Sequence, residues 1–414
     1  MAKSDNLTRK IEKQLPGELV SFIQHAGRLA DSRGERLYLV GGVVRNLLLD
    51  KTNLDIDLVA EGDAIALARE LSDDEAGKIT IHKRFNTAKV GWHGWNIDLA
   101  SARKESYARP GALPTVKPGS LSDDLFRRDF TINAIAVGLN PEGYGRLTDP
   151  YGGQKDLESR MIRFLHQKSF IDDSTRIWRG LRYEQRLDFQ LEPETLRLLK
   201  RDIPMLDTIS GDRIRYEIEC ILNEGLPEKV LHRADELGVL AKLEPSLKGN
   251  DCLAERFQQA REVSSPSHPP VGLYLALLTY PLDNKPREKL TSYLRLPRTL
   301  AKNLKDTASI KAKMSQLADS RLKPSAVYHL LEGYSTQSLT ANLIAGDFPI
   351  AYQHLQLYLD RLRTVKPILT GNDLMKMGIP QGPRIKEILN QLLDARLDGK
   401  VKTRDDEEGL VKSG

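Results

Sequence analysis

The stretch LYLVGGVVRNLLLDKTNLDIDLV, residues 37–59, decides the fold. Its first four residues are apolar and predict a short strand, and the two glycines that follow predict a tight turn. Residues 43–49 then predict a helix, and residues 55–59 predict a second strand. A strand, a glycine turn, a helix and another strand in so short a stretch indicate a small α/β unit.

The same pattern continues to about residue 150. A second helix is predicted over 64–71, and three apolar or alternating runs predict strands over 78–81, 88–92 and 95–100. From about residue 155 apolar residues recur at spacings of three and four, which is typical of helices. The predicted fold class is therefore α+β, with a small N-terminal mixed-sheet domain followed by an all-α region. Three prolines predict a linker over 264–270.

Composition excludes several classes of protein. The chain has 414 residues, 62 of them Lys or Arg and 57 Asp or Glu, with a net charge of +5. No run approaches the roughly 18 apolar residues of a membrane helix, and the N-terminus lacks the apolar segment of a secretory signal. Cys220 and Cys252 are too few for a disulfide framework or a zinc site. We therefore expect a cytoplasmic protein.

Two aspartates in LDIDL carry the sharpest chemical signal. Asp55 and Asp57 are two apart in a predicted strand, so their side chains project from the same face. Magnesium suits such a pair, because it prefers oxygen ligands and binds through one or two carboxylates plus substrate phosphates. A solvated strand edge is the alternative for an isolated D-x-D, but the glycine turn upstream favours the metal.

Three further segments could complete a nucleotide site. Glycines let backbone N–H groups approach a phosphate, and an arginine next to them can add a forked contact. Asp98, on a later strand, offers a third carboxylate, or else it caps a strand or forms an ion pair. The segment RRDFTINA at 127–134 offers arginine forks for phosphates, a carboxylate for a ribose hydroxyl, and an amide. The candidates are Gly41, Gly42, Arg45, Asp98, Arg128, Asp129 and Asn133. The Pro- and Gly-containing stretch 103–121 is predicted to be a mobile loop beside this site.

A charged cluster follows at the start of the helical region. Asp173 and Arg176 are one helical turn apart, and Arg179 and Arg182 lie near the same stripe. The pair could form an ordinary surface ion pair, which would stabilise little. Alternatively, it presents an acceptor and a fork of donors that could read the edge of a base.

Positive charge is concentrated late in the chain. Residues 285–323 hold eleven Lys and Arg against three acids, and residues 361–386 hold six against one. Solvated helix faces are one interpretation. Basic residues in the first turn of the helix predicted over 383–398 oppose its dipole, however, so a nearby RNA phosphate would explain them. The candidate RNA-binding residues are Lys302, Lys305, Arg384 and Lys386.

These pieces, in order, resemble the class II tRNA nucleotidyltransferases and bacterial poly(A) polymerases of the DNA polymerase-β-like superfamily. The matching motifs are GGVVR, LDIDL, RKESYARPG, RRDFTINA, DPYGGQKDLESRMIRF and DDSTRIWRGLRYEQRLDF. The resemblance is dense over 37–225 and looser to about 400. It implies a polymerase-β-like catalytic head followed by an all-α neck, body and tail.

The resemblance also implies a role for each motif. Asp55 and Asp57 would bind two catalytic Mg²⁺ ions, the Gly-Gly loop and Arg128 would contact the triphosphate, and Asp129 the ribose. Asp173 and Arg176 would read the base of CTP or ATP, and the tail would bind the acceptor–TΨC half of tRNA. The expected divisions are an N-terminal helical segment 1–36, a catalytic head 37–150, a neck with base recognition 151–210, a body 211–270, a basic tail 271–402 and a frayed terminus 403–414.

The implied function is addition of CMP and AMP to tRNA 3′ ends. The sequence departs from the family pattern at Asp172, where Glu is usual, and at Asn46, where Asp is common. The long loop before RRDF disfavours an enzyme that adds only CC, and the acidic end at 405–408 disfavours general polyadenylation. An enzyme that adds only the terminal A, a poly(A) polymerase and a non-catalytic RNA-binding protein remain alternatives.

Overall fold

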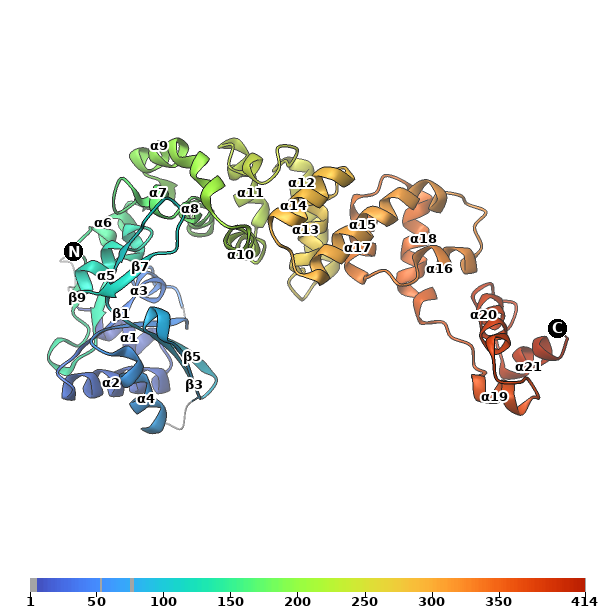
Figure 1. Cartoon of the computed structure of the whole chain (residues 1–414), viewed down its shortest axis with the longest axis horizontal. Helices are drawn as coiled ribbons and strands as arrows, with labels where there is room; N and C mark the ends of the chain where they lie inside the picture. Colours follow the sequence, from blue (N-terminus) through green and yellow to red (C-terminus); the bar gives the residue numbers. More distant parts are fainter. Residues whose placement is uncertain (1–5, 53, 75–77, 414) are drawn as a thin grey trace. The chain divides into compact units, whose positions relative to one another are not determined.

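The computed structural model describes residues 6–52, 54–74 and 78–413 (Figure 1). The chain forms two compact units, Met1–Ile218 and Glu219–Gly414. A mixed sheet lies in the first unit and the second is helical, so the predicted α+β class is confirmed. Among the described residues, no helix is long and apolar enough to cross a membrane.

Seven strands form the main sheet of the first unit, in the order β3-β4-β5-β2-β1-β8-β9. β2 and β5 are parallel, and every other neighbouring pair is antiparallel, which confirms the predicted mixed sheet. The strands are β1 (Arg36–Val40), β2 (Ile56–Glu61), β3 (Lys78–His82), β4 (Thr87–Trp92), β5 (Trp95–Ser101), β8 (Ala136–Gly138) and β9 (Leu147–Thr148). A separate short parallel pair is formed by β10 (Met161–Ile162) and β11 (Gln190–Leu191).

Helices cover one face of this sheet. α2 packs against β1, and α4 packs against β3, β4 and β5. Residues of α4 at spacings of three and four are buried, as expected for a helix with one apolar face. Ala88, Val90 and Trp92 of β4 are buried, with Trp92 4.8 Å from the ring of Phe22 in α2, whereas Lys89 between them is exposed. The alternation places Lys89 on the face opposite these helices.

The helices of the first unit are α1 (Thr8–Gln14), α2 (Gly17–Ser32), α3 (Gly42–Leu48), α4 (Ala64–Asp74), α5 (Leu121–Phe126), α6 (Gly153–Glu158), α7 (Ser169–Asp172), α8 (Thr175–Leu187), α9 (Pro193–Asp202) and α10 (Gly211–Leu222), which contains the division between the units. α3 and α4 confirm the two helices that were predicted near the glycine turn.

The second unit is built from helices, and its described residues include two apolar clusters. One cluster includes Ile310, Leu331 and Leu355, and the other joins Leu374, Ile388 and Leu392. The helices are α11 (Pro227–Glu236), α12 (Asp251–Ser264), α13 (Val271–Thr279), α14 (Asn284–Tyr293), α15 (Arg298–Leu317), α16 (Pro324–Leu331), α17 (Thr336–Ala345), α18 (Pro349–Asp360), α19 (Gly371–Lys376), α20 (Pro383–Leu397) and α21 (Arg404–Ser413). The predicted linker over 264–270 lies between α12 and α13.

Two segments differ from the sequence prediction. The stretch 103–121 contains a two-stranded antiparallel pair, β6 (Arg103–Ser106) and β7 (Thr115–Pro118), where a loop was expected. Residues 403–414 were expected to be frayed, but α21 occupies most of them. Its Glu407 is fully buried, accepts the N–H groups of Ile368 and Leu369, and lies 3.0 Å from Arg396. These contacts with distant residues hold the helix in place.

Candidate functional site

Carboxylates stand side by side where β2 and β5 run parallel. Asp57 of β2 is the direct register partner of Asp98 of β5. Asp55 directly precedes β2. On the other side of Asp98, Lys89 of β4 is its antiparallel partner, and the two side chains lie 3.3 Å apart. The structure therefore brings the carboxylates at the start of β2 next to the carboxylate in the middle of β5.

The surroundings of Asp57 disfavour its charge. Burial raises the pKa of Asp57 to about 6, with Asp55 and Asp98 adding to the rise and Arg128 opposing it. A bound cation would relieve this repulsion. Among the described residues, no three Asp, Glu, His or Cys side chains form a complete metal site by themselves. Two carboxylates supplemented by substrate phosphate oxygens are the donor set that Mg²⁺ commonly uses, so Asp55 and Asp57 fit this ion.

The glycine turn opens beside Asp57. Gly41 has a φ of +75°, a conformation that glycine adopts without strain. A Cβ at this position would lie 2.9 Å from Nη1 of Arg128 and 3.5 Å from Oδ2 of Asp57. Arg128 is anchored by Asp124, 2.9 Å away, and its Nε is buried without a hydrogen-bond partner. The turn, the arginine and the carboxylate therefore border one small space, and nucleotide binding there stays a prediction.

A buried polar network supports this space. Arg45 donates to Asn133 at 2.6 Å, and Asn133 donates to Asp129 at 2.9 Å. Asp129 in turn lies 2.8 Å from Arg179. Burial alone would raise the pKa of Asp129, but Arg179 and the Asn133 amide outweigh it, so the pKa is lowered. Arg45 is only 3% exposed and its side chain donates to Asn46 and Asn133, so the direct phosphate contact that the sequence predicted for it stays a prediction.

Asp173 and Arg176 are held by separate partners. Asp173 Oδ1 accepts from the Thr175 N–H and hydroxyl at the start of α8, and Oδ2 lies 2.7 Å from Arg213 of α10. Arg176 donates to the Ser169 hydroxyl at 2.7 Å and to the Arg127 carbonyl at 2.6 Å. With Arg176 only 4% exposed, the surface ion-pair interpretation is wrong. Sequence spacing offered no signal for Arg213.

Arg179 and Arg182 are also tied to acids. Arg179 pairs with Asp129, and Arg182 lies 3.7 Å from Glu217 of α10. The guanidinium of Arg182 also lies over the Tyr183 ring, 5.2 Å from its centre. These contacts fix the face of α8 that carries the predicted arginines.

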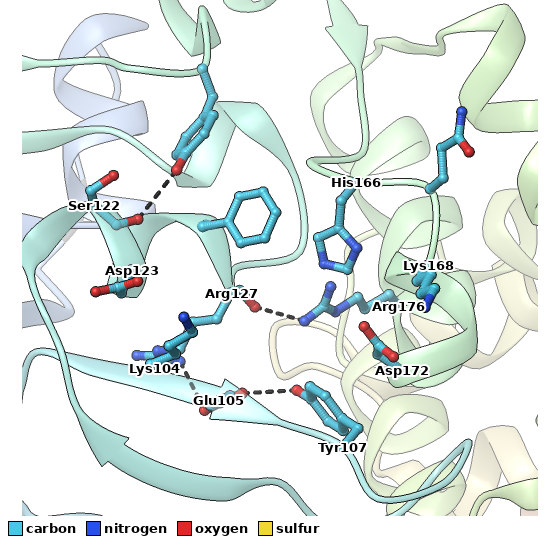
Figure 2. Close-up of a pocket in the computed structure, with 13 residues that line it drawn as sticks. Lys104, Glu105, Tyr107, Ser122, Asp123, Arg127, His166, Lys168, Asp172 and Arg176 are labelled. Atoms are coloured by element: carbon cyan, nitrogen blue, oxygen red, sulfur yellow. Dashed lines mark hydrogen bonds and ion pairs between the residues drawn. The ribbon is translucent and has the colours of Figure 1, made fainter.

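A cavity of about 620 Å³ adjoins Arg176. Figure 2 shows it between the β6–β7 pair, α5 and the start of the helical region, with the Arg176 guanidinium close to His166 and Asp172. Tyr107 donates to Glu105 at its edge, at 2.8 Å. Burial, Arg176 and Lys168 lower the pKa of His166 to about 4, so the imidazole is neutral near pH 7. His166 and Tyr107 lacked any ligand spacing, and only the fold reveals that they share a cavity with Arg176.

The candidate RNA-binding residues are exposed on helices of the second unit. Lys302 and Lys305 lie on α15, and Lys302 pairs with Asp306. They line a groove of about 680 Å³ between α14 and α15, together with the buried Arg287. Arg384 and Lys386 lie in the first turn of α20, as predicted. The structure therefore places two exposed pairs of cations on two different helices.

Parallel strands with paired carboxylates beside a glycine turn define a nucleotidyltransferase head. Residues 37–163 match a family described as the poly A polymerase head domain, and residues 188–250 match one described as a probable RNA and SrmB-binding site of polymerase A.

Similarity to known proteins identifies the family of this chain. The chain is 31% identical to the A-adding tRNA nucleotidyltransferase of Halalkalibacterium halodurans, over 97% of this chain and 94% of that protein. It is 34% identical to the A-adding tRNA nucleotidyltransferase of Geobacter sulfurreducens, over 96% of this chain but only 47% of that protein, and so spans about half its length. The Thermotoga maritima CCA-adding enzyme, solved in complex with tRNA, superposes with a TM-score of 0.77 at 29% identity, over 99% of this chain and 98% of that one. The chain belongs to the class II tRNA nucleotidyltransferases, the family of the CCA-adding enzymes.

Proposed function

We propose that this protein adds CMP and AMP from CTP and ATP to the 3′ end of tRNA without a nucleic-acid template. The observation that supports this most directly is the placement of Asp57 between Asp98 and the Gly41 turn, with Arg128 at the turn. The RNA 3′ hydroxyl would attack the α-phosphorus of the nucleotide, and pyrophosphate would leave.

The chain's own residues divide this work. The backbone at Gly41 and Gly42 and the guanidinium of Arg128 would bind the triphosphate and offset the charge that develops on its oxygens. Asp55 and Asp57 would hold Mg²⁺. Two bound Mg²⁺ ions would lower the pKa of the attacking hydroxyl and stabilise the leaving group.

Base selection would involve Asp173 and Arg176. A forked guanidinium and a carboxylate present donors and an acceptor that can match the edge of cytosine or adenine. Ser169 and the Arg127 carbonyl fix the Arg176 fork, and Thr175 and Arg213 fix the carboxylate. Such fixed polar groups discriminate well, because a wrong base would leave them unpaired.

Addition of the terminal A alone is the second candidate function. Relatives of this chain are described as A-adding, CC-adding and CCA-adding enzymes, and two A-adding proteins, at 34% and 31% identity, favour this candidate. The deciding experiment supplies tRNA that lacks CCA, and tRNA that ends in CC, with CTP, ATP or both. Incorporation of cytidine supports full CCA addition. Incorporation of A into the CC-ended tRNA alone supports the A-only enzyme, and long A tracts on arbitrary RNA support a poly(A) polymerase.

An Asp57→Ala variant tests the metal assignment and the non-catalytic alternative. We expect nucleotide transfer to fall by at least about a thousandfold, because one ligand of a phosphoryl-transfer metal is lost, with tRNA binding nearly unchanged. Asp73→Ala, an exposed aspartate on α4, is the matched control and should keep wild-type activity. Wild-type turnover by Asp57→Ala would overturn the assignment.

A further inference from the structure

Four residues that are register partners on neighbouring strands form a single row across one face of the sheet. Asp57 on β2 pairs with Asp98 on β5, Asp98 with Lys89 on β4, and Lys89 with Thr80 on β3. Register partners project from the same face, with neighbouring strands roughly 4.8 Å apart. The row lies on the face opposite α2 and α4, where Lys89 and Thr80 are exposed.

The two ends of this row differ in what they can bind. At the Asp57 end, the strand order continues to β1 and its glycine turn, where Gly41 and Arg128 enclose the proposed triphosphate site. In phosphoryl transfer the attacking and leaving oxygens lie roughly in line on opposite sides of the phosphorus. With the leaving pyrophosphate on the Gly41 side of Asp57, the attacking RNA hydroxyl must approach from the Asp98 and Lys89 side.

Lys89 is the cation of the row on that side. Its side chain is 46% exposed and that of Asp98 is 44% exposed, so their ion pair is accessible to solvent and contributes little to stability. An ammonium has three donors, and Asp98 occupies only part of this capacity. An exposed cation beside the expected path of a polyanion is placed to bind one of its phosphates.

We propose that Lys89 binds the last internucleotide phosphate of the RNA acceptor, the phosphate nearest the attacking 3′ hydroxyl. This subsite rests on the proposed function, because that function defines which strand carries the hydroxyl. The exposed residues of β3 on the same face, Lys78, Thr80 and His82, continue the polar surface outward from Lys89. Lys89 would thus orient the RNA end toward Asp98 while the nucleotide is held on the other side of Asp57.

A double-substitution cycle tests the contact. The acceptor is tRNA ending in CC, either natural or with a neutral methylphosphonate at the last internucleotide position, and the enzyme is wild type or Lys89→Ala. We expect each single change to raise the KM for tRNA about fivefold, with the KM for ATP unchanged. The combined change should cost little more than either alone, because both remove the same contact.

The controls separate this contact from other effects. Lys89→Arg should retain most of the affinity, and Lys155→Ala, an exposed lysine on α6 after β9 at the opposite edge of the sheet, should respond to the methylphosphonate as the wild type does. If the methylphosphonate raises the KM for tRNA as much in Lys89→Ala as in the wild type, the proposal is overturned. A fall in kcat with the KM for tRNA unchanged would also overturn it. The same double-substitution cycle can be measured as equilibrium binding of these RNAs without metal, which requires no nucleotide transfer. Failure of the Lys89 proposal is therefore distinguishable from failure of the proposed function.

Discussion

At the residue scale, the site is organised by charges that are paired before any ligand arrives. Asp129, Asp173 and Arg128 each have an ion-pair partner in the first unit. Asp57 differs, because burial and two neighbouring carboxylates disfavour its ionised form. A position where the surrounding protein destabilises the ionised form of a side chain is a candidate functional site, because a ligand can supply the opposite charge.

Arg176→Ala should blur the choice of nucleotide. The variant loses the fork that Ser169 and the Arg127 carbonyl hold, so we expect the ratio of kcat/KM for the correct and incorrect nucleotide to fall about tenfold or more, with a smaller change in tRNA affinity. Arg176→Lys should not rescue it, because a point charge does not replace a planar fork. Arg197→Ala, an exposed arginine paired with Glu194 on α9, is the control. Unchanged nucleotide preference in Arg176→Ala would contradict the base-reading role.

The sequence identified individual residues better than their partners. Asp55, Asp57 and Asp98 could be selected because acidic residues inside β-rich apolar runs are conspicuous. The direct pairing of Asp57 with Asp98 depends on strand order, which no local pattern encodes. Asp173 pairs with Arg213, whereas Arg176 donates to Ser169 and to a backbone carbonyl. Helical spacing alone therefore wrongly suggested a surface ion pair between Asp173 and Arg176.

At the element scale, the turn between β1 and α3 brings the backbone to the carboxylates. Gly41→Ala combines a φ of +75° with a Cβ 2.9 Å from Arg128 Nη1. We expect stability to fall by about 1 kcal/mol and kcat/KM for the nucleotide by at least about tenfold, as Arg128 is displaced.

Gly152→Ala is a matched control for this turn. Gly152 has a φ of +72° but open space around its Cβ position, so it should show similar backbone strain without the loss of activity. Thermal unfolding and steady-state kinetics of both variants measure the two effects. Equal kinetic losses in both would show that strain, and not the approach to Arg128, is responsible.

A histidine joins two helices of the second unit in a pH-dependent way. His329 of α16 lies 2.7 Å from Asp394 of α20 and 3.3 Å from Glu332, and the hydrogen bond to Asp394 raises the pKa of His329 despite partial burial. A raised pKa in the folded state stabilises below the unfolded value of about 6.5, and this stability is lost as pH rises through the folded pKa.

Asp394→Asn should therefore lower Tm at pH 6 and have little effect at pH 8.5. The side chains are 42% and 45% exposed, so we expect a contribution of about 0.5 kcal/mol. Glu387→Gln, on the same helix and paired with Arg384 and not with a histidine, should show no such pH dependence. A Tm difference for Asp394→Asn that is the same at both pH values would contradict the link.

Regular elements were predictable where the apolar pattern is strong. The strands over 78–81, 88–92 and 95–100 and the helices near the glycine turn were found within a few residues. The β6–β7 pair was missed because its residues are polar and interrupted by Pro and Gly, and α21 because it lies at the end of the chain, where fraying was expected. Both depend on contacts with distant parts of the chain, such as Glu407 with Ile368, which sequence periodicity does not report.

At the scale of the whole molecule, chemistry and charge are divided between the two units. The carboxylate row and its network lie in Met1–Ile218, whereas the two basic stretches lie in Glu219–Gly414. Phosphate contacts supply affinity without reading sequence. Under the proposed function this division would allow the second unit to bind many tRNAs, because its phosphate contacts would not constrain which base the first unit selects.

This division predicts a specific salt dependence of tRNA binding. Removing two phosphate contacts should lower the magnitude of the slope of log K against log salt by about two. We expect this for Lys302→Ala with Lys305→Ala, and again for Arg384→Ala with Lys386→Ala, each with about tenfold weaker binding at low salt. Neither pair should change the ratio of kcat values for CTP and ATP, because both lie outside the unit that contains Arg176.

The control removes the same charge elsewhere in the second unit. Lys400 and Lys412 are exposed and lie outside both basic stretches and outside the segment that matches the RNA-binding family, so their double substitution by alanine should leave the slope within error of the wild type. Filter binding across a salt series measures all three double variants. Because non-specific screening would weaken every variant alike, only a change in slope confined to the α15 and α20 pairs identifies those residues as phosphate contacts. An unchanged slope for either pair would remove it from the RNA-binding surface.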